Sequence, residues 1–229
     1  MAFAVAHRGL SSERAENTLA AFKAAADAGF GGIEMDLRPT ADGQVVVLHD
    51  ATLDRTTDGT GAVASHPWPH VANLRGRDGP VPRLADVANA LSPWRGLWNL
   101  EVKDPAALAG TLAVARGLGN RALVSSMHPD VLIESLKQAP DVPRALIALG
   151  PVEREDLAAA RRADCGWFNA DHDFLDEDAA SKVQSHGFRL GAYTVNDAFR
   201  AVELTKLGAQ SIITDRREVL AVVRGPAVW

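Results

Sequence analysis

The sequence contains a single cysteine and no long hydrophobic run. With Cys165 alone, neither an intrachain disulfide framework nor a metal cluster held by several cysteines can form. No uninterrupted apolar segment approaches the ~20 residues that a membrane-spanning helix requires. A formal net charge of -5 leaves no broad basic surface, which argues against nucleic acid as a partner and against stable membrane association.

The first residues, MAFAVAHRG, lack the basic region and the following apolar stretch of a secretory signal, so we expect a cytoplasmic protein. The composition of the 229 residues, 47% hydrophobic and 23% charged, is that of a globular domain with a sizeable core. No Pro/Gly-rich linker, low-complexity tract or fixed-period repeat divides the chain. Residues 1–229 are therefore expected to form a single domain.

Short apolar segments rich in β-branched residues alternate with Ala/Leu/Arg segments of helical periodicity along the whole chain. The candidate strands are residues 3–7, 32–36, 97–103, 121–127, 144–149, 165–169, 188–194 and 210–214. The candidate helices are residues 19–28, 84–91, 106–118, 129–138, 154–162, 177–185, 197–207 and 216–223. Eight strand–helix units in roughly 220 residues predict an α/β fold, the (β/α)8 TIM barrel. A doubly wound open sheet is the alternative, disfavoured because no Gly-rich phosphate loop follows the first strand.

One segment departs from this alternation. After residues 32–36 the chain continues through Asp42-Gly43, a strong two-residue hairpin signal, into a short apolar run that ends at His49. A turn at these two residues would place Asp36 directly opposite His49, on one face of the hairpin. Residues 53–82, rich in Thr, Gly and Pro, are expected to form a substrate-facing loop excursion.

Polar residues gather where the first three barrel strands are expected to end, which is where barrel active sites form. The first strand ends in His7-Arg8, and Glu34 and Asp36 lie two residues apart on the second. On the third strand Glu101 and Lys103 show the same period of two, while the alternate positions are apolar. Since outward-facing barrel residues pack on helices, the polar set is predicted to point inward and converge on one rim.

Glu34, Asp36 and Glu101 are candidate ligands for a hard divalent cation. Three carboxylates that face one another cannot all stay ionised without a cation or raised pKa values. All-oxygen ligand sets are typical of Mg²⁺ and Ca²⁺. A surface ion-pair network is the alternative interpretation of these three residues.

His7 and His49 are a candidate acid/base pair, in which one histidine deprotonates a nucleophile and the other protonates a leaving oxygen. Arg8 and Lys103 would supply positive charge to an anionic group, the arginine as a bidentate fork and the lysine as a point charge. The alternatives are a core role for the histidines and charge balance of the carboxylates for the two cations. A metal site, two cations and two histidines, without a nucleophilic Ser-His-Asp or Cys-His arrangement, indicate phosphoryl transfer.

Short motifs are spread over nearly the whole chain: His7-Arg8-Gly9, Glu16-Asn17-Thr18, Glu34-Met35-Asp36, His49-Asp50, Leu53-Asp-Arg-Thr-Thr57, Gly59-Thr-Gly61, Asn99-Leu-Glu101-Val-Lys103, Thr194-Val-Asn196 and Thr214-Asp215. Each motif is weak alone, but their order and spacing together are specific. In this order and spacing they resemble the motifs of the glycerophosphodiester phosphodiesterase family.

The resemblance implies a TIM barrel that uses a divalent cation to hydrolyse glycerophosphodiesters to an alcohol and glycerol 3-phosphate. In the same way it implies metal ligands at Glu34, Asp36 and Glu101, catalytic histidines at His7 and His49, phosphate contacts at Arg8 and Lys103, and a supporting role for Asn17. Two departures from the family pattern, Met127 and Tyr193, are expected to line the pocket mouth and to affect which alcohol is accepted.

The sequence is also compatible with two other functions. One is a related barrel phosphodiesterase that acts on intact phospholipids, and the other is a non-catalytic barrel that binds a phosphorylated ligand. The residues do not decide which histidine is the acid, nor whether water attacks directly or a glycerol hydroxyl attacks first to give a cyclic phosphate.

Overall fold

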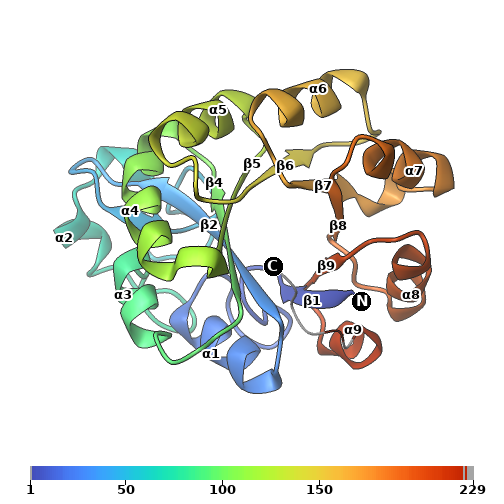
Figure 1. The fold of residues 1–229 in the computed structure, drawn as a ribbon. Helices are drawn as coiled ribbons and strands as arrows, with labels where there is room; N and C mark the ends of the chain where they lie inside the picture. The colour runs from blue at the N-terminus through green and yellow to red at the C-terminus, as the bar shows by residue number, and fades with distance from the viewer. Residues whose placement is uncertain (1, 224, 226–229) are drawn as a thin grey trace.

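The computed structural model describes residues 2–223 and 225. Eight parallel strands close into a barrel, and helices pack around its outside (Figure 1), so the predicted TIM barrel is confirmed. The barrel closes where β1 pairs with both β2 and β9. The barrel strands are β1 (Phe3–Ala6), β2 (Gly32–Pro39), β4 (Leu97–Val102), β5 (Ala122–Ser126), β6 (Arg144–Ala148), β7 (Trp167–Asp171), β8 (Arg189–Tyr193) and β9 (Ser211–Thr214).

The helices follow the predicted segments closely. The principal ones are α1 (Leu19–Ala28), α3 (Leu84–Ala90), α4 (Leu108–Leu118), α5 (Pro129–Gln138), α6 (Arg154–Arg162), α7 (Glu177–Ser185), α8 (Ala198–Lys206) and α9 (Arg217–Val222). α1 begins where the Thr18 hydroxyl accepts a hydrogen bond from the Ala21 N–H at 3.2 Å, and it ends at Gly29 with φ of 89°. This pairing of a hydroxyl N-cap with a left-handed glycine stops the helix cleanly at both ends.

Two hydrophobic clusters hold the barrel together. The larger one fills the layer between strands and helices and includes Trp98 and Leu100, the outward-facing partners of the polar residues on β4. The smaller one lies inside the barrel, where Phe3 and Trp167 pack edge to face with ring centroids 6.1 Å apart. Packed side chains therefore close the barrel interior beneath the polar residues at the carboxyl ends of the strands.

The hairpin after β2 has a different register from the predicted one. β3 (Val45–Val47) runs antiparallel to β2 with Leu37 opposite Val47, which places Leu48 rather than His49 opposite Asp36. The loop has three residues, not two, because Thr40 pairs with Gln44 through its backbone and Gly43 takes a φ of 78°. The predicted Asp36–His49 pairing is therefore wrong.

His49 nevertheless reaches the site because the chain leaves the strand after Val47 and bends. The Arg38 Nε donates to the His49 carbonyl oxygen at 2.7 Å and fixes this bend.

The excursion after β3 is more ordered than the expected loop. It contains a short 3-10 turn (Val63–Ser65) and α2 (Trp68–Val71). Its apolar side chains form a small core of their own, made by Val46, Leu48, Leu53, Val63, Val71 and Val81. This local packing gives the excursion a fixed shape beside the barrel mouth.

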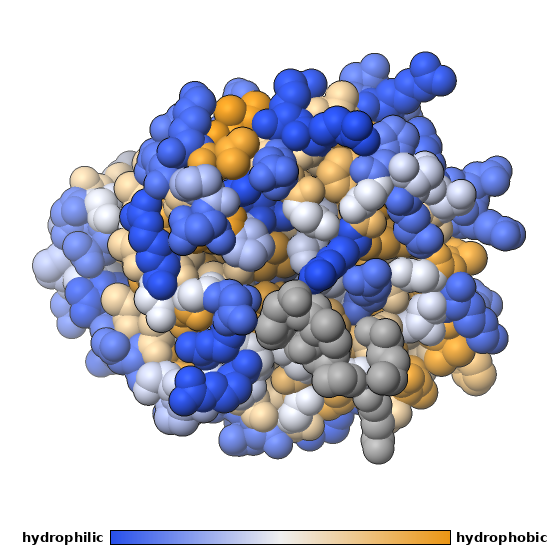
Figure 2. All heavy atoms as spheres, viewed as in Figure 1, coloured by the Kyte–Doolittle hydropathy of each residue, from blue (hydrophilic) through white to orange (hydrophobic). Residues whose placement is uncertain are grey.

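Among the described residues, no helix combines the length and the hydrophobicity needed to cross a lipid bilayer. On the face seen in Figure 2, hydrophobic side chains lie in separate groups between hydrophilic ones.

Candidate active site

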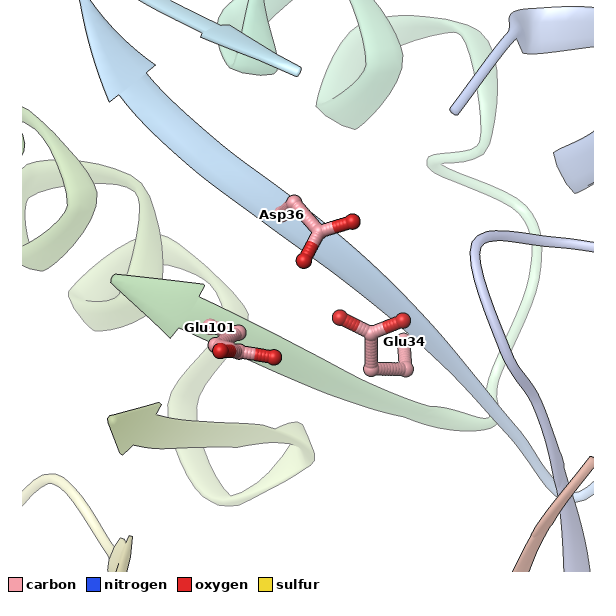
Figure 3. Close-up of side chains that lie close together, drawn as sticks. All are labelled: Glu34, Asp36 and Glu101. Atoms are coloured by element: carbon pink, nitrogen blue, oxygen red, sulfur yellow. The ribbon is translucent and has the colours of Figure 1, made fainter. Parts of the chain in front are cut away.

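Two neighbouring strands bring three carboxylates together. The parallel register of β2 and β4 sets Asp36 beside Glu101, and Glu34 lies two residues earlier on the same face of β2. One oxygen from each carboxylate lies within 4.8 Å of the others, and Figure 3 shows the three side chains pointing toward one another. The residues are only 2%, 0% and 7% exposed for Glu34, Asp36 and Glu101.

Burial and mutual repulsion perturb this acidic cluster. Burial, and then the negative charges of Asp36 and Glu101, raise the pKa of Glu34 well above its usual range. Burial and the charge of Asp36 likewise raise the pKa of Glu101. Glu34 Oε1 and Asp36 Oδ1 are buried and accept no hydrogen bond. The two oxygens without a hydrogen bond belong to a cluster of facing carboxylates, which fits a hard divalent cation, so the triad can hold a metal ion.

Arg8 and Lys103 lie at the edge of the cluster. The Arg8 Nε is 3.2 Å from Asp36 Oδ2, and the Lys103 Nζ is 2.6 Å from Glu101 Oε1 and 3.4 Å from Asp36 Oδ1. Burial opposes the charged form of Lys103, but Glu101 and Asp36 outweigh it and raise its pKa. Both side chains therefore stay cationic next to the carboxylates and can face an anionic group.

The backbone after β1 adopts an unusual shape to present these groups. Arg8 has a φ of 58°, a region that non-glycine residues rarely occupy, and its N–H donates to Glu34 Oε2 at 2.9 Å. Gly9 follows with a φ of 79°, and a Cβ there would lie 2.7 Å from the backbone of Ala21. The glycine therefore allows the loop to lie directly against α1.

His7 is held by a carboxylate that directly follows β9, the strand that closes the barrel. Its Nδ1 lies 2.9 Å from Asp215 Oδ1, and its Nε2 lies 4.0 Å from Glu34 Oε2. Ser11 Oγ donates to Asp215 Oδ1 at 2.8 Å and Asn196 Nδ2 donates to Asp215 Oδ2 at 2.6 Å. Although burial opposes ionisation of Asp215, these bonds hold the pKa of its carboxyl well below the usual range. An ionised Asp215 fixes the orientation of the His7 ring.

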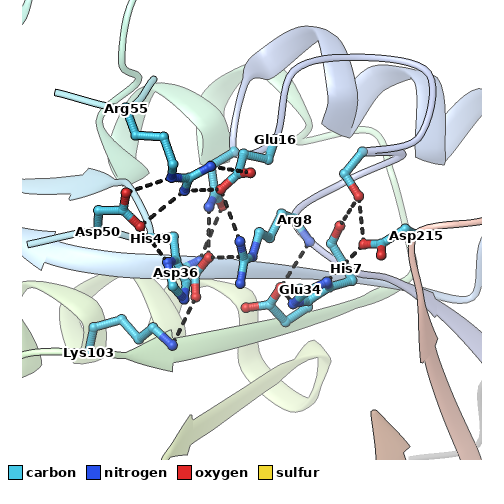
Figure 4. A network of polar contacts seen from close by, with 12 residues as sticks. His7, Arg8, Glu16, Glu34, Asp36, His49, Asp50, Arg55, Lys103 and Asp215 are labelled. Atoms are coloured by element: carbon cyan, nitrogen blue, oxygen red, sulfur yellow. Dashed lines mark hydrogen bonds and ion pairs between the residues drawn. The ribbon is translucent and has the colours of Figure 1, made fainter. Parts of the chain in front are cut away.

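His49 has a similar arrangement on the other side of the mouth. Its Nδ1 lies 2.7 Å from Asp50 Oδ1, and Asp50 also accepts from the Arg55 Nε at 2.6 Å. Arg55 continues to Glu16, which also pairs with Arg8 at 3.0 Å (Figure 4). Hydrogen bonds from Arg55, and then the charge of Arg8, lower the pKa of Glu16. The network links the excursion to the loop after β1.

A cavity of about 200 Å³ lies above the acidic cluster. Of the predicted site residues, eight line it: His7, Arg8, Glu34, His49, Glu101, Lys103, Met127 and Tyr193. The other two lie just beneath, where Asn17 Nδ2 donates to Asp36 Oδ2 at 2.7 Å. Tyr193 is anchored by its hydroxyl, which donates to the Ala148 carbonyl oxygen at 2.5 Å. All ten predicted residues thus meet at one place.

Several polar residues of the site were assigned no role from the sequence. Asp215 and Asp50 stand in recognised motifs, but nothing in the spacing indicated that they contact the histidines. Asn169 on β7 is 2% exposed and lines the cavity, and a Cβ at Gly191 would lie 2.2 Å from its Oδ1. The sequence feature that could have indicated Asn169 is an amide on a predicted apolar strand, together with Gly191 on the next strand, which leaves room for its side chain.

Comparison with known proteins agrees with this geometry. The model of the Glycerophosphoryl diester phosphodiesterase family matches residues 7–219 of this chain. A relative from Caldanaerobacter subterraneus, named glycerophosphodiester phosphodiesterase, is 30% identical over 94% of this chain and 95% of its own length. A bovine protein, glycerophosphodiester phosphodiesterase 1, is 51% identical over a shorter stretch of 71 residues, 31% of this chain and 22% of that protein.

Solved structures share the fold. An Oleispira antarctica phosphodiesterase, determined in complex with its product sn-glycerol 3-phosphate, superposes with a TM-score of 0.90 at 24% identity and 97% coverage of both chains. A glycerophosphodiester phosphodiesterase from Agrobacterium tumefaciens gives a TM-score of 0.82 at 26% identity, covering 97% of this chain and all of the other.

Proposed function

Because the chain belongs to the glycerophosphoryl diester phosphodiesterase family, we propose that it hydrolyses glycerophosphodiesters to an alcohol and glycerol 3-phosphate. One observation carries the proposal: a buried acidic triad, two cations and two histidines surround a single cavity. The product bound by the Oleispira antarctica phosphodiesterase supports the choice of substrate class.

Glu34, Asp36 and Glu101 would hold the divalent cation, for which Mg²⁺ and Ca²⁺ are the candidates. When bound, such a cation supplies positive charge that offsets the charge of the phosphate group. Glu34 Oε1 and Asp36 Oδ1 support this assignment, because both are buried without a hydrogen bond and buried polar atoms are nearly always hydrogen-bonded; Lys103 Nζ lies 3.4 Å from Asp36 Oδ1.

Arg8 and Lys103 bind the phosphate oxygens in this proposal. Their side chains lie between the acidic cluster and the cavity, and nearby carboxylates keep both charged. Fixed positive groups that face the transferring phosphoryl group stabilise the charge that develops on its oxygens.

His7 and His49 move the protons. Since each Nδ1 is engaged by a carboxylate, Asp215 or Asp50, each Nε2 is the nitrogen left for exchange with substrate. One histidine accepts the proton of the attacking oxygen, and the other donates a proton to the departing alkoxide of the alcohol. Overall, one water is consumed, one P–O bond to the alcohol breaks, and one P–O bond forms.

The experiment is an assay of metal-stripped protein on a panel of glycerophosphodiesters, with Mg²⁺, Ca²⁺ or Mn²⁺ added back. We expect glycerol 3-phosphate and free alcohol in equal amounts, only with a cation present. His7→Ala and His49→Ala should each reduce the rate by about 100-fold or more with the fold intact, whereas exposed His186→Ala serves as the matched control. Near-normal turnover in both active-site variants would overturn the roles of the histidines.

The same assay follows the order of bond formation. A cyclic glycerophosphate that accumulates early and then disappears indicates attack by the glycerol hydroxyl. Direct incorporation of ¹⁸O from water without a cyclic species indicates attack by water.

A further inference from the structure

A second cleft, of about 630 Å³, lies beside the active site and is lined by four arginines: Arg14, Arg55, Arg75 and Arg77. They come from the loop after β1 and from the excursion between β3 and α3. Arg55 is neutralised by Glu16 and Asp50. This hollow is called here the arginine cleft. The guanidinium groups of Arg14, Arg75 and Arg77 make no hydrogen bond or ion pair within the described part of the chain.

The acidic residues near these arginines are committed elsewhere. Asp58 Oδ1 accepts from the Arg75 backbone N–H at 2.7 Å, and Asp78 Oδ2 accepts from the Ala15 N–H at 2.5 Å. Glu13, beside Arg14, uses both carboxylate oxygens on the Arg217 side chain. These carboxylates hold the loops in place and form no ion pair with the three guanidinium groups, although the charge of Arg14 contributes to the lowered pKa of Glu13.

A third hollow shares lining residues with both the arginine cleft and the catalytic cavity. It is lined by His7 and Arg8, which also line the catalytic cavity, and by Ser11 and Glu16, which also line the arginine cleft. A substrate whose phosphodiester lies at the catalytic site can therefore extend its alcohol portion toward the three arginines.

We propose that the arginine cleft binds a second anionic group, of phosphate type, on the alcohol portion of the substrate. The inference rests on the proposed function and extends it: the favoured glycerophosphodiesters carry a further phosphate. Guanidinium groups match phosphate through paired, charge-assisted hydrogen bonds. The arginine cleft, of about 630 Å³, has room for a phosphate group.

The test compares pairs of substrates that differ by one phosphate: glycerophosphoglycerol and glycerophosphoinositol, each with and without a phosphate ester on the alcohol. The measured quantity is the ratio of kcat/KM for the phosphorylated and unphosphorylated member. We expect a ratio well above one at low salt, which falls as added salt screens the exposed charges. Arg14→Gln, Arg75→Gln and Arg77→Gln should each lower the ratio by about fivefold.

The matched control is Arg95→Gln. Arg95 is exposed and precedes β4, so it lies at the opposite end of the barrel, and the substitution changes the net charge equally. An effect of Arg95→Gln equal to that of the cleft variants would overturn the proposal. An unchanged ratio in all three cleft variants, with normal turnover of the unphosphorylated substrates, would also overturn it while the proposed function stands.

A binding measurement keeps the cleft testable if no diester is hydrolysed, in which case the proposed function itself fails. Metal-free protein is titrated with pyrophosphate by calorimetry. Binding that is lost in the triple variant Arg14→Gln/Arg75→Gln/Arg77→Gln supports an anion site in the cleft, and equal binding by both proteins overturns it. Sedimentation with anionic vesicles that depends on these arginines, without any effect on the kcat/KM ratio, would assign the cleft to a membrane surface and refute the proposal.

Discussion

Replacement of Glu34 by glutamine should change the stability of this protein in opposite directions with and without a divalent cation. The buried Glu34 carboxylate carries a raised pKa because burial and two neighbouring carboxylates disfavour its charge. At an effective dielectric constant of about 20, two like charges at the 4.8 Å limit of the oxygen cluster repel by about 3 kcal/mol, part of which Arg8 offsets. In chelator, Glu34→Gln should therefore stabilise the fold by about 1–2 kcal/mol.

With a divalent cation bound, wild type should instead be more stable than Glu34→Gln. A ligand that binds only the folded state at about 100 times its Kd stabilises that state by about 2.7 kcal/mol. For a chain of this size, such a gain raises Tm by about 5–10 °C. Glu34→Gln loses a ligand oxygen and its charge, so most of this gain should disappear.

The assay is thermal and urea unfolding at pH 7.5 in EDTA and in millimolar Mg²⁺, Ca²⁺ or Mn²⁺, with Glu134→Gln, at a half-exposed helix position, as the control. Wild type should be the less stable protein in EDTA and the more stable one with cation. A variant that is destabilised in EDTA, or that gains as much from the cation as wild type does, would refute the metal site.

Three further predictions follow from single residues. Asp215→Asn should lower kcat by about 100-fold with little change in KM, because His7 loses the carboxylate that orients it; a kcat within twofold of wild type would contradict this. Burial raises the pKa of the Cys165 thiol to about 12, against 9.0 when exposed, so the folded state keeps a proton that the unfolded state releases. Stability should therefore fall by about 1.4 kcal/mol per pH unit between these values, and Cys165→Ala should remove that slope in urea unfolding from pH 8.5 upward. Gly9→Ala should cost about 3 kcal/mol in urea unfolding, since φ is 79° and the new Cβ would meet the Ala21 backbone; an unchanged midpoint would argue against this close approach.

The sequence predicted the features that depend on local periodicity. A period of two on β2 and β4 identified Glu34, Asp36 and Glu101 as inward-facing, and the barrel topology then brought them to one rim. Helix ends were predicted within one or two residues, because caps such as Thr18 and Gly29 act through short-range bonds. One strand was misplaced: residues 165–169 were expected and Trp167–Asp171 is observed, since Cys165 and Gly166 belong to the turn before the strand.

Features that depend on the exact loop geometry or on the pairing of distant residues could not be predicted. The hairpin register differs by one residue because Gly43 serves as the third loop residue, a choice that Asp-Gly alone does not determine. The His7–Asp215 contact joins residues 208 positions apart and exists only because β1 and β9 close the barrel. The arginine cleft likewise combines loops that only the packed excursion brings together.

The most direct test of the metal site and its phosphate contacts is anomalous diffraction from crystals soaked in Mn²⁺ and glycerol 3-phosphate. We expect one anomalous peak among the carboxylates of Glu34, Asp36 and Glu101, with the phosphate of the ligand next to it and in contact with Arg8 and Lys103. A peak at another place, or a phosphate bound away from the two histidines, would contradict it.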